Sequence, residues 1–63
     1  MIESLIETER VAEMAAVSKE TVRQWRRRGM GPPHFKLCGA VRYREADVLA
    51  WIARCRVEPG GTA

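Results

Sequence analysis

The side chains of this sequence that are best suited to chemistry lie in one short segment, residues 18–28, and they are hydrogen-bond donors. Four long polar side chains recur there at spacings of three and four, which places them on one side of a helix: Lys19, Arg23, Gln24 and Arg27. Arginine can donate two hydrogen bonds to guanine, and glutamine can pair with adenine. Ser18 and Thr21 stand near the start of the segment, where we expect phosphate contacts. The pattern predicts a helix that reads DNA.

The charge of the chain is concentrated in its middle. Residues 19–44 contain eight lysines and arginines and a single acid, Glu20, so this segment carries a net charge of +7 in a chain whose total is +3. The two flanking segments together carry a net charge of −4. A fold that presents the middle of the chain on one side therefore has a strongly basic face, as expected of a phosphate-binding protein.

Neither catalysis nor a bound cofactor is predicted. Glu13 and Glu20 have no partners arranged for acid–base chemistry, and the sequence contains no Ser–His–Asp grouping and no glycine-rich phosphate loop. Cys38 and Cys55 form no CxxC pair, and His34 is the only histidine, which disfavours a zinc site. We therefore expect no enzymatic activity, no cofactor and no metal, and we expect both cysteines to be free thiols.

The first half of the chain has the pattern of two short helices joined by a tight turn. We expect the first helix at Glu9–Ala15, with Thr8 as its N-cap. The second helix follows the N-cap Ser18 and continues through Arg28, with Gly29 as a left-handed C-cap. This arrangement is a helix-turn-helix, in which the second helix enters the major groove by its N-terminal end.

A β-hairpin is predicted next. Apolar and polar residues alternate in two arms, residues 35–37 and 41–43, around a turn at 38–40. The alternation predicts that the apolar side chains of both arms face the core: Phe35, Leu37, Val41 and Tyr43. Lys36 and Arg42 then face outward, and Arg44 follows at the exit of the hairpin. We expect these three basic residues to contact DNA beside the second helix.

A third helix completes the predicted fold. Apolar residues at helical spacing indicate a helix over Glu45–Arg56. We expect Trp25 and Trp51 to lie in the core, and we expect Leu5 and Ile6 to act as a hydrophobic staple against the first helix. The predicted fold class is mainly α with a small β-hairpin: a winged helix-turn-helix with three helices and a two-stranded wing.

Two blocks of the sequence resemble a known superfamily of DNA-binding proteins. Within residues 9–25, the letters ERVAEM followed by VSKETVRQW resemble the MerR-type helix-turn-helix. Residues 37–52 read LCGAVRYREADVLAWI and are similar to the excisionase and AlpA-like branch of that superfamily. The resemblance covers almost the whole chain, with the two motifs in the order and at the distance that are typical of the branch.

The resemblance implies an excisionase of a phage or integrative element. Such proteins bind direct repeats in attachment-site DNA, often cooperatively, bend the DNA and direct an integrase towards excision. The implied partners are double-stranded DNA, an integrase and further copies of the chain. Two alternatives stay open: a short transcriptional regulator of the same branch, and a protein-interaction module whose basic face docks an acidic partner. The polar outer side of residues 19–27 favours DNA, because protein-docking faces carry apolar or aromatic hot spots.

Length and hydropathy indicate one small globular domain. Of the 63 residues, 46% are hydrophobic and 30% are charged, proportions that are typical of folded proteins. We expect the DNA-binding domain at residues 1–57 and a flexible tail at residues 58–63. No apolar run approaches the roughly 20 residues that span a bilayer, and the N-terminus does not resemble a signal peptide. We therefore expect a cytoplasmic protein without a membrane partner.

Overall fold

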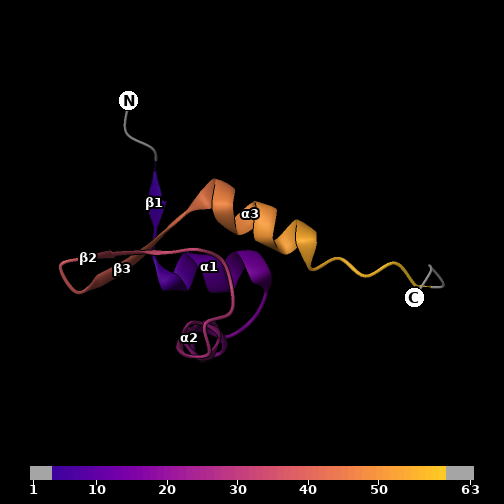
Figure 1. Cartoon of the computed structure of the whole chain (residues 1–63), viewed down its shortest axis with the longest axis horizontal. Helices are drawn as coiled ribbons and strands as arrows, with labels where there is room; N and C mark the ends of the chain where they lie inside the picture. The colour runs from indigo at the N-terminus through magenta and orange to yellow at the C-terminus, as the bar shows by residue number, and fades with distance from the viewer. Residues whose placement is uncertain (1–3, 60–63) are drawn as a thin grey trace.

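The structure is a computed structural model that describes residues 4–59 as helices packed on a small antiparallel sheet (Figure 1). The elements, in chain order, are β1 (Leu5–Ile6), α1 (Thr8–Ala15), α2 (Lys19–Arg27), β2 (Phe35–Leu37), β3 (Ala40–Arg44) and α3 (Glu45–Arg54). The predicted class, mainly α with a β-hairpin, is confirmed. Residues 1–3 and 60–63, and with them most of the predicted tail, lie outside the described residues. None of the helices in the described part of the chain has the length and apolar character that a membrane crossing demands.

Helix α1 begins one residue earlier than the sequence pattern predicts. Its N-cap is Glu7, whose carbonyl oxygen accepts hydrogen bonds from the backbone N–H groups of Arg10 and Val11 at 3.0 and 3.1 Å. The prediction that Thr8 caps the helix is therefore wrong. Thr8 lies inside the first turn, where its hydroxyl accepts a hydrogen bond from Arg26 at 3.4 Å. A tertiary contact thus uses the side chain that the local pattern assigned to the cap.

Helix α2 follows a tight turn; its predicted N-cap and the left-handed conformation of Gly29 are confirmed, but its C-cap is Arg28 and not Gly29. The Ser18 hydroxyl accepts a hydrogen bond from the backbone N–H of Thr21 at 3.1 Å, which caps the N-terminus. At the other end Gly29 has a φ of +72°, the left-handed conformation that glycine adopts at low cost. The helix itself ends at Arg27, and Arg28 is its C-cap. Our expected helix was therefore one residue too long.

The sheet contains a third strand that the sequence pattern did not predict. Leu5 and Ile6 form β1, which pairs antiparallel with β3 and places Ile6 opposite Tyr43. The strand order is β1-β3-β2, so β3 is the central strand. The segment that we expected to pack as a hydrophobic staple is thus a strand that covers an edge of β3. Ile6 is also partly buried against the core cluster that contains Val11 of α1, whereas Leu5 is 40% exposed.

The hairpin between β2 and β3 closes through a two-residue turn. Cys38 and Gly39 have φ angles of +50° and +90°, and Leu37 pairs directly with Ala40. Two consecutive residues with positive φ are the signature of the tight turns that match the twist of a hairpin. The predicted three-residue turn is therefore wrong. A shift of one residue in the register reverses which face one arm presents.

The register decides which side chains of the hairpin are buried. Phe35 pairs with Arg42, so the two side chains share the outer face of the sheet, and Leu37 lies on that face as well. Phe35 is 37% exposed and Leu37 is 46% exposed, which contradicts the prediction that both face the core. Tyr43 is buried and Val41 is partly buried, as predicted.

The core lies between the three helices and the inner face of β3. It consists of five buried side chains: Val11, Ala12, Val22, Tyr43 and Val48. Trp25 and Trp51 are only partly buried; Trp25 packs against this cluster, and Trp51 packs against Trp25 with the two ring centroids 4.9 Å apart. The prediction that the two tryptophans fill the core therefore needs correction.

Helix α3 ends two residues before its predicted boundary. Its C-cap is Cys55, and the backbone N–H of Arg56 bonds to the carbonyl of Ala53 at 3.3 Å, which tightens the last turn. Cys55 and Arg56 are exposed, so no core contact extends the helix further. Cys38 and Cys55 are both free and exposed thiols.

Candidate nucleic-acid interface

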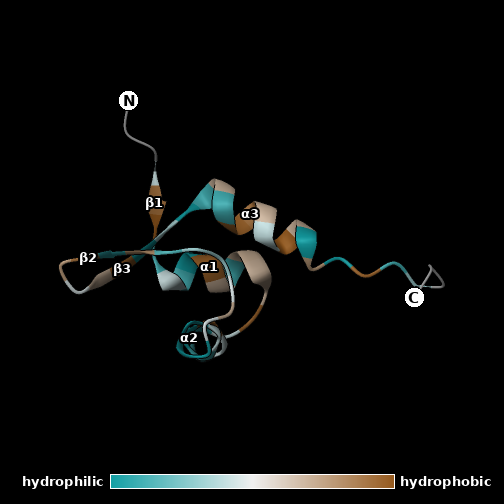
Figure 2. Ribbon diagram, viewed as in Figure 1, coloured by the Kyte–Doolittle hydropathy of each residue, from teal (hydrophilic) through white to brown (hydrophobic). Residues whose placement is uncertain are grey.

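Helix α2 buries one narrow stripe and exposes the rest of its surface. Val22 is its only buried residue, and the ribbon coloured by hydropathy shows α2 as the most hydrophilic of the helices (Figure 2). The side chains predicted to read DNA are all exposed on this helix: Lys19, Arg23, Gln24 and Arg27. The structure thus brings the predicted recognition residues together on one surface, which we call the α2 surface.

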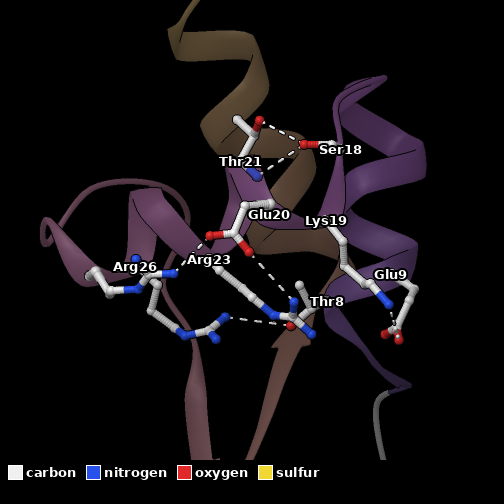
Figure 3. A network of polar contacts seen from close by, with 9 residues as sticks. Thr8, Glu9, Ser18, Lys19, Glu20, Thr21, Arg23 and Arg26 are labelled. Atoms are coloured by element: carbon white, nitrogen blue, oxygen red, sulfur yellow. Dashed lines mark hydrogen bonds and ion pairs between the residues drawn. The ribbon is translucent and has the colours of Figure 1, made fainter.

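The two predicted phosphate contacts of α2 are part of its N-terminal cap. The hydroxyl groups of Ser18 and Thr21 lie 2.9 Å apart and are hydrogen-bonded to each other. Figure 3 shows this contact together with the one to the backbone of Thr21. Ser18 is exposed, and Thr21 is partly exposed. This geometry fixes the direction in which the helix begins, and it leaves both hydroxyl groups at the end of α2 that a helix-turn-helix directs at DNA.

An acid lies in the middle of the α2 surface. One carboxylate oxygen of Glu20 is 2.9 Å from Nη2 of Arg27, and the other is 3.6 Å from Nη1 of Arg23 (Figure 3). Glu20 therefore bridges two of the predicted base-reading arginines. The sequence pattern did not predict this role. The spacing of three residues between Glu20 and Arg23 could have predicted their ion pair, because residues three apart are neighbours on a helix.

A second acid holds the remaining cation of the predicted base-reading set. Nζ of Lys19 lies 3.5 Å from a carboxylate oxygen of Glu9, so the pair links the start of α2 to the first turn of α1 (Figure 3). The pKa of Glu9 is lowered, mainly by a hydrogen bond from the backbone at the start of α1 and also by Lys19. Both effects favour the charged form of the Glu9 carboxylate.

Arg26 differs from its neighbours because it connects elements within the fold. Its guanidinium donates to the hydroxyl of Tyr43 at 3.1 Å and to that of Thr8 at 3.4 Å. The contact to Tyr43 joins α2 to β3, and the contact to Thr8 joins α2 to α1. Sequence reasoning did not identify this role, because the partners lie 17 and 18 residues away along the chain.

The three predicted wing residues are not gathered on one face of the hairpin. Arg42 and Arg44 lie on the outer face with Phe35, and the guanidinium carbon of Arg44 is 5.5 Å from the centroid of the Phe35 ring. Lys36 pairs with Val41 and therefore lies on the opposite face. The wing presents two arginines on one side and one lysine on the other.

Both arginines of the wing also approach acids. Nη2 of Arg42 is 4.0 Å from Glu7, and Nη1 of Arg44 is 3.9 Å from Asp47. All four side chains are at least partly exposed, and ion pairs at such distances near the surface contribute at most about 1 kcal/mol of stability. They can therefore be exchanged for other anionic partners at low cost.

A comparison with known proteins agrees with this arrangement. The family described as a helix-turn-helix domain matches residues 5–56, which contain every helix and strand of the fold. No curated protein and no solved structure matches the chain.

Proposed function

This chain belongs to the helix-turn-helix domain family and binds DNA, and we propose that it is a sequence-specific protein of the excisionase type. The observation that carries the proposal is the α2 surface, where two arginines, a lysine and a glutamine are exposed on a helix capped by Ser18. The hydrogen bond from Arg26 to Tyr43 holds this helix against the sheet. This contact supports a recognition helix with a fixed orientation.

In the proposed complex α2 enters the major groove by its N-terminal end. Arg23 and Gln24 read base edges, and Lys19 and Arg27 extend the same contact surface. Ser18 and Thr21 contact phosphates beside the groove, where the start of a helix favours anions. The family match supports DNA binding, and this assignment of individual roles is our proposal.

We propose that the wing approaches DNA with its tip. Lys36 and Arg42 lie on opposite faces of a narrow hairpin that projects away from the helices (Figure 1). A hairpin that meets the minor groove in this way places one basic face towards each phosphate strand. Arg44 extends the contact along the outer face.

The excisionase role rests on the two sequence blocks that resemble that branch. In this role the protein binds repeated sites in attachment-site DNA, bends the DNA and directs an integrase towards excision in the cytoplasm. A single module buries only about 600–1,000 Å² on DNA. This small interface supports binding in several copies on adjacent repeats.

One observation favours a second candidate function for the outer face of the sheet. Leu5, Phe35 and Leu37 are each between 37% and 46% exposed, and they lie on the same face as Arg42 and Arg44. Apolar side chains beside arginines are typical of protein-docking surfaces. This face is therefore a candidate for docking an acidic, partly apolar segment of a partner such as an integrase.

The dependence of DNA binding on salt tests the proposed function. If the α2 surface and the wing neutralise several phosphates, the logarithm of affinity should fall linearly with the logarithm of salt concentration, with a slope of roughly −0.9 per phosphate contacted. The measurement is a titration of a fluorescent duplex of about 30 base pairs at several salt concentrations. A slope near zero would exclude DNA as the ligand.

Removing the two arginines of the wing should weaken DNA binding without unfolding the protein. The double variant Arg42→Ala/Arg44→Ala is expected to lose at least about tenfold in affinity, roughly 1.4 kcal/mol. Its circular dichroism spectrum should be unchanged, because both side chains lie on the outer face of the sheet. An integrase-dependent excision assay should fail in parallel.

The matched control removes two arginines from the opposite end of the molecule, at the end of α3: Arg54→Ala/Arg56→Ala (Figure 1). This variant loses the same charge and should change DNA affinity much less. A folded wing variant with normal DNA affinity would show that the wing does not contact DNA. If that variant also failed in excision, the outer face would be assigned to the protein partner.

A further inference from the structure

Glu20 occupies a position that an acid should avoid in a surface that binds DNA. It is the only acid in residues 19–44, it is exposed, and it lies in the first turn of α2, the end that enters the groove. A carboxylate there repels every phosphate that approaches the helix. An acid in the first turn of a helix is modestly favoured by the helix dipole, and exposed ion pairs add little more, so the fold gains little from Glu20. The position of Glu20 is therefore better explained by a role in DNA binding than by a role in stability.

The geometry of the carboxylate indicates that role. Its two oxygen atoms have different partners: Oε2 accepts a hydrogen bond from Arg27 at 2.9 Å, and Oε1 lies 3.6 Å from Arg23 (Figure 3). Arg23, Glu20 and Arg27 thereby form one chain of charges along the exposed side of α2. The carboxylate orients the guanidinium of Arg27 by a hydrogen bond and attracts that of Arg23 by its charge.

Such restraint has different consequences for specific and non-specific DNA. An unrestrained arginine can turn to the nearest phosphate, which every sequence offers. A guanidinium held by Glu20 gains less from a phosphate, because the ion pair is weakened and the carboxylate is repelled. A guanine that presents two acceptors offers the guanidinium a planar pair of hydrogen bonds instead. The acid therefore penalises non-specific binding more than specific binding.

We propose that Glu20 is a specificity-determining residue, which positions Arg23 and Arg27 towards base edges and opposes their contact with phosphates alone. This inference rests on the proposed DNA-binding function and assigns a role to a residue outside the base-reading set. The pair between Lys19 and Glu9 follows the same principle at the start of the helix. All three cations of the base-reading set are thus held by acids in the part of the chain that the structure describes.

The test compares the full chain with its Glu20→Gln variant on a randomised duplex library of about 30 base pairs and on the site that the wild type selects. Glutamine keeps the shape of the side chain and removes the charge. We expect the variant to bind random duplex several-fold more tightly. Its ratio of specific to non-specific affinity should fall about tenfold, which is the discrimination contributed by one base pair. Its selected consensus should lose information at the positions read by Arg23 and Arg27.

Glu58→Gln is the matched control. Glu58 also forms an exposed ion pair with an arginine, Arg56, but it lies beyond the end of α3. This variant raises the net charge by the same amount and should leave the specificity ratio and the consensus unchanged. An equal loss of specificity in both variants would show that net charge alone causes the loss. This outcome would overturn the inference.

Two further outcomes are decisive. An unchanged ratio and consensus in Glu20→Gln, with a clear consensus in the wild type, would overturn the role of Glu20 and leave the proposed function intact. A wild type that selects no consensus would overturn sequence-specific binding and this inference together. Circular dichroism of both variants checks that the fold is retained, as expected for exposed side chains.

Discussion

Replacing Trp25 with alanine is expected to lower the free energy of unfolding by about 3 kcal/mol, at the low end of the range for a tryptophan in a core. A domain of this size rarely has more than 3–5 kcal/mol of stability in total. The variant should therefore be unfolded to a large extent at room temperature. Chemical denaturation followed by circular dichroism measures the effect without relying on tryptophan fluorescence.

The size of the expected effect follows from the segments that Trp25 joins. Its ring packs against that of Trp51 on α3, with an angle of 50° between the planes. It also contacts the segment between α2 and β2, where a Cβ atom at Gly31 would lie 3.2 Å from the Cβ of Trp25. Partial burial explains why we expect the low end of the range.

A matched control is available on the exposed side of α3. Leu49 is 55% exposed, so Leu49→Ala should change the free energy of unfolding by less than about 0.5 kcal/mol. A Trp25→Ala protein that folds normally but no longer binds DNA would contradict the prediction. Trp25 would then be a contact residue, and its place at the edge of the core would be structurally unimportant.

The double variant Arg23→Ala/Gln24→Ala should lose most of the specific DNA affinity. Each side chain is expected to contribute roughly 1–3 kcal/mol of discrimination, and the two losses together should approach their sum. Affinity for random DNA should change much less. Both side chains are exposed and the helix keeps its cap, so the fold should be unaffected. Parallel titrations of the selected site and a scrambled duplex measure the difference.

The control for this experiment is Arg56→Ala, which removes one positive charge from an exposed position beyond the end of α3. It should leave the difference between specific and random DNA intact. Equal losses of the double variant on both duplexes would mean that Arg23 and Gln24 contact only the backbone. The reading of base edges would then have to come from other residues of the α2 surface.

Features set by neighbours along the chain were predictable from the sequence. The cap at Ser18, the left-handed Gly29 and the exposed side of α2 depend on residues within one or two helical turns. Hydrogen bonds and helical spacing at that range are encoded by residue type and order. Local residue order therefore specifies the helix-turn-helix and the set of side chains that α2 exposes.

Features that depend on distant partners were decided by the tertiary structure. Whether Phe35 and Leu37 are buried depended on the register of the hairpin, and a one-residue difference in turn length reversed their side of the sheet. Leu5 and Ile6 became a strand because the edge of β3, almost 40 residues later, offered backbone hydrogen-bonding groups. No local signal specifies such a partner.

The same division applies to the charges of the interface. Composition alone showed that residues 19–44 carry a net charge of +7, because they contain eight cations and one acid. It did not determine which of these cations share one face of the molecule. Only the tertiary structure shows which cation stabilises the fold. Arg26 donates hydrogen bonds to Tyr43 and Thr8, whereas Arg27 donates one to Glu20 on the surface of α2. Residue type fixes the charge of a side chain, but the position of its partner in space decides where that charge acts.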